Sequence, residues 1–271
     1  MALPTPAPDR TAVVTGASSG IGREIARQLA QRGQGLTLVA RREDRLKVLA
    51  EELAGAQGVR VEVVAADLTD QVARERIAGE VTDRGLAAQV LVNNAGLSTV
   101  GPVHGSDVAA ELAMIRTDVE AVAHLSSLFL PGMVERGAGA VLNVASTAAF
   151  QPMPGQAAYA ASKAFVLSYS QAVRAELKGT GVSVTVLCPG PVDTEFAESA
   201  GFEGTEAEAA LPRFMWLPAE AVATAAVDGL DRGRAVVIPG VANHLSALGG
   251  RFAPRSVLLP IIARQHPGLR R

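Results

Sequence analysis

The sequence has little of what marks several classes of protein. It holds one cysteine, Cys188, in 271 residues, so no disulfide can form within the chain. We expect Cys188 to be a small buried apolar side chain and the protein to be cytoplasmic, where thiols stay reduced. The formal net charge is only −2. A charge this small gives no overall attraction to nucleic acid or to an anionic membrane, so neither is expected as a partner.

Long apolar runs and metal-binding patterns are also missing. The longest uncharged run, 137–162, contains Pro152 and Pro154 and does not predict a membrane-spanning helix. Prolines within residues 1–9 exclude the apolar helical core of a signal peptide and predict a flexible leader. No two histidines have the spacing of metal ligands, so no metal site is expected. The histidines are His104, His124, His244 and His266.

What the chain does have is a regular alternation of short apolar runs and longer stretches of helical periodicity. Strands are expected at 11–15, 36–40, 59–65, 89–92, 140–145, 182–187 and 236–238. Helices are expected at 21–32, 43–53, 70–83, 107–135, 157–178 and 218–231. The alternation predicts an α/β fold with a single doubly wound parallel sheet of about seven strands, Rossmann-type, with helices on both faces. We expect it to fill one catalytic domain at 10–244, with ligands beyond the carboxyl ends of its strands.

A glycine-rich turn, T-G-A-S-S-G-I-G at 15–22, follows the first predicted strand. Its glycines allow the backbone to approach a pyrophosphate, and the next helix begins with free N–H groups that bind anions. The spacing G-x-x-x-G-x-G differs from the general dinucleotide fingerprint, so an ordinary strand–helix turn stays open as an alternative. The candidate cofactor-binding residues here are Gly16, Ser18, Ser19, Gly20, Ile21 and Gly22.

Two arginines, Arg41 and Arg42, follow the second predicted strand, where dinucleotide-binding folds contact the adenosine ribose. Guanidinium groups pair bidentately with phosphate, so the two residues favour NADP, which carries a 2′-phosphate. A carboxylate at this place would instead bind the ribose hydroxyls of NAD. Because Glu43 and Asp44 come next, NAD remains the alternative cofactor.

Asp67 and Leu68 follow the third predicted strand and are further candidates for the cofactor site. The carboxylate of Asp67 is placed to accept a hydrogen bond from the adenine amino group. Its alternative role is structural, as a turn carboxylate or as the N-cap of the next helix. The two roles are compatible.

Three residues are candidates for acid–base chemistry. Tyr159 and Lys163 are four positions apart, so on a helix their side chains point the same way. A nearby ammonium stabilises a phenolate and lowers the tyrosine pKa from its usual value of about 10, which suits proton donation to a carbonyl oxygen. Ser146 ends the fifth predicted strand and is placed to hydrogen-bond that oxygen. Each feature taken alone is common in proteins without this chemistry.

The motifs together resemble those of the short-chain dehydrogenase/reductase family, in the family's order and over about residues 10–240. They are T-G-A-S-S-G-I-G at 15–22, N-N-A-G at 93–96, Ser146, Y-A-A-S-K at 159–163 and P-G-P-V-D-T at 189–194. The run A-R-R-E-D-R-L at 40–46 resembles the family's NADP-preferring branch.

The resemblance implies that Tyr159 is the acid/base, that Lys163 lowers its pKa and binds the nicotinamide ribose, and that Ser146 positions the substrate oxygen. It also implies cofactor contacts after the fourth and sixth strands, from Asn94, Ala95, Gly96, Pro189, Gly190, Val192 and Thr194. One position departs from the family pattern, because Asp118 stands where an asparagine usually supports a water-linked proton relay with the lysine. Asp118 serves the relay if a backbone carbonyl suffices, and weakens it if the asparagine side chain must bend the helix.

Residues 195–217 follow the sixth strand, where the fold places a substrate lid. Apolar side chains there predict a hydrophobic carbonyl or alcohol substrate, unless they only hold the lid down: Phe196, Phe202, Leu211, Phe214, Met215 and Trp216. The extension 245–271 mixes arginines with apolar residues, and we expect it to pack on the domain or on a partner subunit and not on a membrane. The helices at 107–135 and 157–178 resemble those of the family's subunit interface, which implies a homodimer or homotetramer.

The leading hypothesis is therefore an NADP(H)-dependent oxidoreductase that interconverts a carbonyl compound and an alcohol. The first alternative is an NAD-dependent dehydrogenase of the same family. The second is a catalytically idle NADP-binding sensor or scaffold, which the complete Ser–Tyr–Lys set argues against. A nucleotide-sugar epimerase or dehydratase would use the same Tyr–Lys pair, but such members usually carry a larger C-terminal substrate domain.

Overall fold

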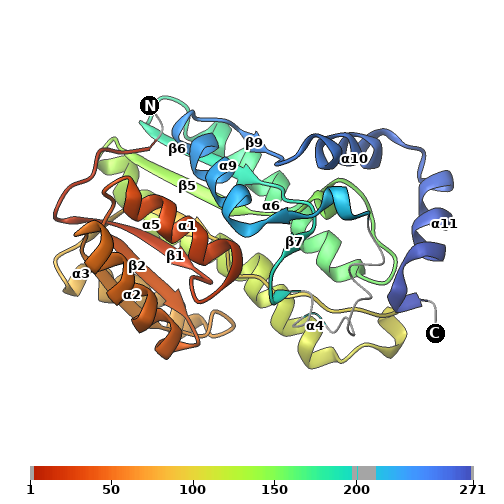
Figure 1. Ribbon diagram of the computed structural model, residues 1–271, viewed down its shortest axis with the longest axis horizontal. Helices are drawn as coiled ribbons and strands as arrows, with labels where there is room; N and C mark the ends of the chain where they lie inside the picture. Colours follow the sequence, from red (N-terminus) through yellow and green to blue (C-terminus); the bar gives the residue numbers. More distant parts are fainter. Residues whose placement is uncertain (1–2, 197–199, 201–211, 270–271) are drawn as a thin grey trace.

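A computed structural model describes residues 3–196, 200 and 212–269. Its main sheet consists of β1 (Arg10–Thr15), β2 (Leu36–Ala40), β3 (Val61–Ala65), β4 (Ala87–Asn93), β5 (Gly139–Val144), β6 (Val182–Leu187) and β9 (Val236–Val237). These seven strands lie in the order β3-β2-β1-β4-β5-β6-β9, and every neighbouring pair is parallel (Figure 1). The predicted fold class is confirmed.

Helices cover both faces of the sheet. One face carries α1 (Gly20–Gln31), α2 (Glu43–Gln57) and α9 (Ala219–Asp231). The other carries α3 (Gln71–Asp83), α5 (Ala121–Glu135) and α6 (Ala157–Glu176), with α4 (Val108–Ile115) before α5. A small second sheet pairs β7 (Val192–Asp193) with β8 (Leu217–Pro218). The chain continues through α10 (Val241–Phe252) and α11 (Arg255–Gln265), at the end of the molecule opposite α2 and α3 (Figure 1).

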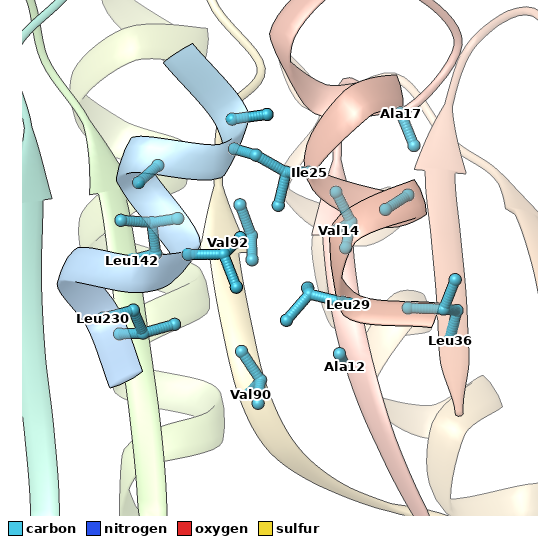
Figure 2. Close-up of a cluster of buried hydrophobic side chains, with 14 of the residues drawn as sticks. Ala12, Val14, Ala17, Ile25, Leu29, Leu36, Val90, Val92, Leu142 and Leu230 are labelled. Carbon is cyan, nitrogen blue, oxygen red and sulfur yellow. The ribbon is translucent and has the colours of Figure 1, made fainter. Parts of the chain in front are cut away.

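The central strands are buried on both sides, which explains why they are nearly uninterrupted apolar runs. Successive side chains of a strand point to opposite faces of the sheet. Val14 and Val92 belong to the cluster under α1 and α9, whereas Val13 and Leu91 belong to the cluster under α3 and α5. Figure 2 shows Leu29 of α1 among the side chains of the first cluster. The sheet is thus held rigidly, and its carboxyl edge is a fixed base for a site.

The long helix predicted at 107–135 is not regular throughout. It consists of α4, a π-helical turn at Arg116–Glu120, and α5. A single π turn adds one residue to a helical turn and leaves the apolar pattern on either side almost unchanged. Sequence periodicity therefore predicted one helix where the structure has two segments joined by this turn.

The first described residues of the chain make defined contacts with the core. Leu3 packs against the first core cluster, and Pro4 O accepts a 2.8 Å hydrogen bond from Nε2 of the buried Gln34. At the other end α10 begins at Val241, slightly before the extension expected at 245. Within the described ranges, no helix has the length and apolar character needed to cross a membrane.

Leu29→Ala is expected to lower the free energy of unfolding by about 2–5 kcal/mol, because the fully buried side chain leaves a cavity between α1 and the sheet. Leu245→Ala is the matched control, since Leu245 is 63% exposed and its loss should change stability by less than about 0.5 kcal/mol. Urea unfolding followed by circular dichroism measures both. Equal losses for the two variants would contradict this account of the core.

Candidate active site

A cavity of about 650 Å³ lies at the carboxyl edge of the sheet. The strand order reverses between β1 and β4, and this switch point is where doubly wound sheets bind their ligands. Segments that follow β1 to β6 all reach the cavity wall, although they are far apart in the sequence. The predicted site residues that line it are Gly16, Ser18, Ser19, Gly20, Ile21, Arg41, Arg42, Asp67, Leu68, Asn94, Ala95, Gly96, Ser146, Tyr159, Lys163, Pro189, Gly190, Val192 and Thr194.

The glycine-rich turn between β1 and α1 requires its glycines. Gly16 and Gly20 have φ of +67° and +54°, in the left-handed region that favours glycine. Gly22 lies behind the cavity wall, where a Cβ would come within 2.4 Å of Gly16 O and 2.3 Å of Asn94 Nδ2. The close packing leaves the cavity side of the turn open, and α1 begins there with unpaired N–H groups, which are suited to binding an anion.

A set of hydrogen bonds joins this turn to the end of β4. Thr15 Oγ1 accepts from Asn94 N at 3.0 Å and from Ala95 N at 3.1 Å, and donates to Val92 O at 3.1 Å. Asn94 Nδ2 in turn donates to Thr15 O at 2.9 Å. The side chain of Asn94 therefore holds the two strand ends together from behind the cavity, while the residue also lines it.

Arg42 and the two serines of the turn form one cluster. Arg42 Nη2 donates to Ser19 Oγ at 2.7 Å and to Ser18 Oγ at 3.1 Å. Arg41 is exposed and lines the same part of the cavity. Four hydrogen-bonding side chains predicted to contact the adenosine half of a dinucleotide thus lie together at the end of β2.

Two residues that the sequence analysis did not single out join this cluster. Glu195 accepts hydrogen bonds from Arg42 Nη1 at 2.9 Å and from Arg45 Nη1 at 2.8 Å. These bonds hold the pKa of Glu195 below its ordinary value. Arg45 was visible as the third arginine of the run at 40–46, whereas nothing in the sequence connects Glu195 with it. The guanidinium groups thus converge on one anion, which in this structure is a carboxylate.

Asp67 acts as a turn carboxylate. Its Oδ1 accepts hydrogen bonds from both N and Oγ1 of Thr69, each at 2.9 Å. The N-cap of α3 is Asp70, which accepts from Val72 N at 2.9 Å. Of the structural alternatives, the turn role is therefore confirmed and the N-cap role falls to Asp70. Asp67 also lines the cavity.

Ser146, Tyr159 and Lys163 meet in the middle of the cavity. Ser146 follows β5, and its Oγ accepts from Ala148 N at 3.1 Å, which fixes the side chain. Tyr159 and Lys163 lie one turn apart in α6, and Lys163 Nζ is 5.6 Å from the centroid of the Tyr159 ring. Ser146 lowers the pKa of the Tyr159 hydroxyl, as the Lys163 charge does. The predicted juxtaposition of a serine, a phenol and an ammonium is present.

Lys163 is compensated by Asp118, which lies behind the cavity wall in the π turn. Lys163 Nζ is 2.9 Å from Asp118 Oδ2 and donates to Val144 O at 3.3 Å. Asp118 is fully buried, and its Oδ1 accepts from Leu97 N at 2.8 Å. A Cβ on Gly96 would lie 3.1 Å from Lys163 Nζ, so glycine at this position leaves room for the pair. The residue that departs from the family pattern is the counter-ion of the lysine.

Burial and charge compete in this group. Burial lowers the pKa of Lys163, but the Asp118 carboxylate and the Tyr159 phenol together raise it above its ordinary value. Burial raises the pKa of Asp118, with Lys163 opposing. Burial likewise raises the pKa of Tyr159, and Lys163 opposes that shift too. The ammonium therefore lowers the pKa of Tyr159 as expected, but burial has the larger effect and the net shift is upward.

The structure also places Cys188, the apolar side chains expected in the lid, and the C-terminal extension. Cys188 is buried directly after β6, and burial raises the pKa of its thiol to about 12, which confirms an inert interior residue. Of the apolar side chains expected in the lid, Phe196 and Trp216 line the cavity and Phe214 is exposed. Phe202 and Leu211 lie outside the described residues. The C-terminal extension was expected only to pack on the domain or on a partner subunit, but four of its residues line the cavity: Ile262, Gln265, His266 and Pro267.

Comparison with known proteins agrees with this geometry. The short chain dehydrogenase family matches residues 10–203. Sulfoacetaldehyde reductase 2 of Chromohalobacter salexigens is 41% identical over 68% of this chain and 73% of the relative. A short-chain dehydrogenase from Sphingobium yanoikuyae, solved in complex with NADPH, is 34% identical with a TM-score of 0.79, over 89% of this chain and 92% of that one. One from Burkholderia phymatum, solved with NAD, is 26% identical with a TM-score of 0.79, over 88% and 92%.

By its fold and its cavity, the protein belongs to the doubly wound α/β proteins with a ligand cavity at the switch point of the sheet. Within that class, the chain belongs to the short-chain dehydrogenase family, as the resemblance of its motifs implied. It is an oxidoreductase acting on alcohols or carbonyl compounds.

Asp118→Ala is expected to lower the free energy of unfolding by about 3–5 kcal/mol, because it leaves the Lys163 ammonium buried without a counter-charge. Adding Lys163→Met removes that charge too and should recover a large part of the loss. Urea unfolding of the wild type, both single variants and the double variant gives the coupling between the residues. Losses that simply add would show that the two side chains are not a coupled pair.

Proposed function

We propose that this protein is an NADP(H)-dependent carbonyl reductase or alcohol dehydrogenase that acts on a hydrophobic substrate. The observation that carries the proposal is the convergence of Ser146, Tyr159 and Lys163 with the glycine-rich turn in one cavity. The turn alone would fit any nucleotide-binding protein. The three side chains in the middle of the cavity add the groups that move a proton to or from a substrate oxygen.

The residues present fit a nicotinamide dinucleotide. The turn at Gly16 and Gly20 and the start of α1 offer a backbone cradle that a Cβ would fill, since one on Gly20 would come within 3.1 Å of Thr194 Cγ2. Arg41 and Arg42 would hold the 2′-phosphate of NADP, together with the turn's serines. Bound there, the cofactor would supply or accept the hydride. Val192, Thr194 and the 94–96 segment would contact its nicotinamide half.

The chain's own residues account for the proton. In the direction of reduction, the Tyr159 hydroxyl donates a proton to the substrate oxygen, and in oxidation the phenolate accepts it. Ser146 Oγ holds that oxygen beside the hydroxyl. Lys163 favours the phenolate by its charge, and Asp118 keeps that charge in a buried position. Asp118 thus acts on catalysis through Lys163, as a positioning residue.

Of the two cofactors, the charges at the end of β2 favour NADP. Glu43, the carboxylate that would bind an NAD ribose, pairs with Lys47 at 2.8 Å, one turn along α2. Arg45 and Arg42 both donate hydrogen bonds to Glu195, so Arg45 brings a third guanidinium to this end of the cavity. The structural relatives include one solved with NADPH and one solved with NAD, so the preference rests on these side chains.

We further propose a cytoplasmic homo-oligomer, either a dimer or a tetramer, assembled through the helices at 107–135 and 157–178. In support, both regions expose apolar side chains: Val108, Leu112, Ile115 and Phe165. Exposed apolar residues gathered on two helices are typical of a subunit contact. Light scattering coupled to size-exclusion chromatography distinguishes monomer, dimer and tetramer.

Tyr159→Phe is expected to lower kcat by about 10²–10⁴-fold, because the variant keeps the ring but loses the proton donor. Cofactor binding should change little. Tyr169→Phe is the matched control, since Tyr169 lies on the same helix and stacks on Phe165 outside the cavity. NADPH absorbance during reduction of a panel of ketones measures turnover. A Tyr159→Phe enzyme with near-wild-type kcat, or a wild type that turns over nothing, would refute the assignment, the latter favouring an idle cofactor-binding protein.

The wild-type enzyme is expected to have a higher kcat/KM with NADPH than with NADH. The double variant Arg41→Ala/Arg42→Ala should lower the ratio of these two kcat/KM values by about 10–100-fold. The double variant loses two charge-assisted contacts with the 2′-phosphate of NADPH, whereas NADH carries no 2′-phosphate and makes no such contacts. Arg60→Ala/Arg232→Ala removes the same charge from residues that do not line the cavity. Added salt should weaken NADPH more than NADH. A wild type that prefers NADH would reject the NADP assignment.

Glu195→Gln is expected to tighten NADPH binding roughly twofold to fivefold and leave NADH unchanged, because the carboxylate competes with the 2′-phosphate for Arg42 and Arg45. Glu43→Gln, which removes an exposed carboxylate paired with Lys47, is the control. Fluorescence titration gives both dissociation constants. Equal effects on the two cofactors would mean that Glu195 and the phosphate do not compete.

A further inference from the structure

The end of the cavity away from the glycine-rich turn is closed by the C-terminal segment. Ile262 and Gln265 of α11 and the following His266 form part of its wall. Met153 and Trp216, from segments far away in the sequence, complete it. This part of the cavity lies beyond Ser146 and Tyr159, where the body of a substrate would extend from the reacting oxygen.

His266 fixes the segment in place. Its buried ring packs on Gly155, where a Cβ would come within 2.3 Å of Nδ1. Gly268 is equally tight, since a Cβ there would lie 2.6 Å from Val100 Cγ1. The last turn of the described chain is thus seated on two other segments and is an integral wall of the cavity.

Hydrogen bonds determine the state of the His266 ring. Nδ1 accepts from Gly268 N at 3.2 Å, so it carries no proton. Nε2 is therefore the protonated nitrogen and donates to Gln156 Oε1 at 3.2 Å, while Gln156 Nε2 donates to Ser98 Oγ at 2.8 Å. Burial lowers the pKa of His266, which keeps the ring uncharged at neutral pH. The side chains joined by these hydrogen bonds, His266, Gln156 and Ser98, are therefore all uncharged.

Among the described residues, the far wall of the cavity also contains no lysine or arginine. Among the cavity-lining residues that the structure describes, the cations are Arg41, Arg42 and Lys163. The arginines lie at the adenosine end, and Lys163 is already paired with Asp118.

We infer that the substrate of this enzyme is an uncharged, largely apolar carbonyl compound or alcohol, bound against a wall that the C-terminal segment supplies. A carboxylate, sulfonate or phosphate there would lose its water without gaining a counter-ion, which is costly. Sulfoacetaldehyde, the substrate in the name of the 41% identical relative, carries such an anion. The inference rests on the proposed function, because it assumes that the reacting oxygen lies at Ser146 and Tyr159.

Matched acid and ester ligands test the inference directly. The probes are 5-oxohexanoate and 10-oxoundecanoate, each with its methyl ester, so that the members of a pair differ mainly in charge. Trp216 is the single tryptophan of the chain and lines the wall, so its fluorescence in the NADP⁺ complex reports binding without turnover. Each ester is expected to bind at least about tenfold more tightly than its acid, and KM values during reduction should follow the same order.

A cation added to the wall should change the preference. Gln265→Lys is expected to narrow the ester-to-acid ratio by about tenfold, mainly through tighter binding of the acids. Gln265 is exposed at the rim of the wall, so a lysine of similar length should be tolerated. Gln57→Lys is the matched control, because it makes the same change at an exposed residue that does not line the cavity.

A second variant tests the wall itself. His266→Ala removes the ring that anchors the segment, and it should raise the KM for the longer ester by about tenfold with little change in kcat or in NADP⁺ affinity. His244→Ala is the control, since His244 is exposed on α10 and does not line the cavity. A loss of kcat without a change in KM would show that His266 does not shape the substrate site.

The outcomes separate this inference from the proposed function. Acids that bind as tightly as their esters, esters that do not bind at all, or an unchanged ratio in Gln265→Lys would overturn the inference. Selective ester binding with no turnover would support the neutral pocket and count against the proposed reaction. Turnover that depends on Tyr159 but favours the acids would support the reaction and reject the pocket.

Discussion

The arrangement of the active site depends on holding one positive charge inside the protein. Lys163 is 4% exposed, and a buried ammonium is stable only when it is paired and hydrogen-bonded. Asp118 supplies the counter-charge, Val144 O a hydrogen-bond acceptor, and Gly96 the space that the pair needs. The π turn between α4 and α5 carries Asp118. Three separate parts of the chain therefore serve a single charge, and that charge opposes the rise that burial causes in the pKa of Tyr159.

The same reasoning explains the different character of the cofactor end, where charge is concentrated at the surface. Arg42 and Arg45 are about half exposed, so water shares the cost of keeping them charged. Their contact with Glu195 is an open, screened ion pair that a stronger anion can replace, unlike the enclosed pair at Lys163. Burial thus separates a fixed catalytic charge from exchangeable binding charges within one cavity.

The sequence was most informative where local pattern and function coincide. Strands β2 and β6 have the predicted bounds, because short apolar runs bounded by glycine or charge leave little freedom. Motif residues at strand ends, such as Asn94 and Ser146, converge because parallel strands deliver their carboxyl ends to one edge. Contacts set by tertiary packing were missed. No pattern connects His266 with Gln156, which lies 110 residues earlier, and none shows that a single π turn brings Asp118 to Lys163.

The cavity therefore has three electrostatic zones along its length, and their order has a consequence for chemistry. Exchangeable cations lie at the adenosine end, a compensated ammonium in the middle, and neutral amides, an uncharged imidazole and apolar side chains at the far end. A highly anionic dinucleotide can enter such a cavity in only one favourable orientation, with its phosphates toward the arginines and the start of α1. That orientation leaves the neutral end to the substrate. Under the proposed function, that orientation would bring the two reactants together at Tyr159, where the described residues place a phenol beside a compensated ammonium.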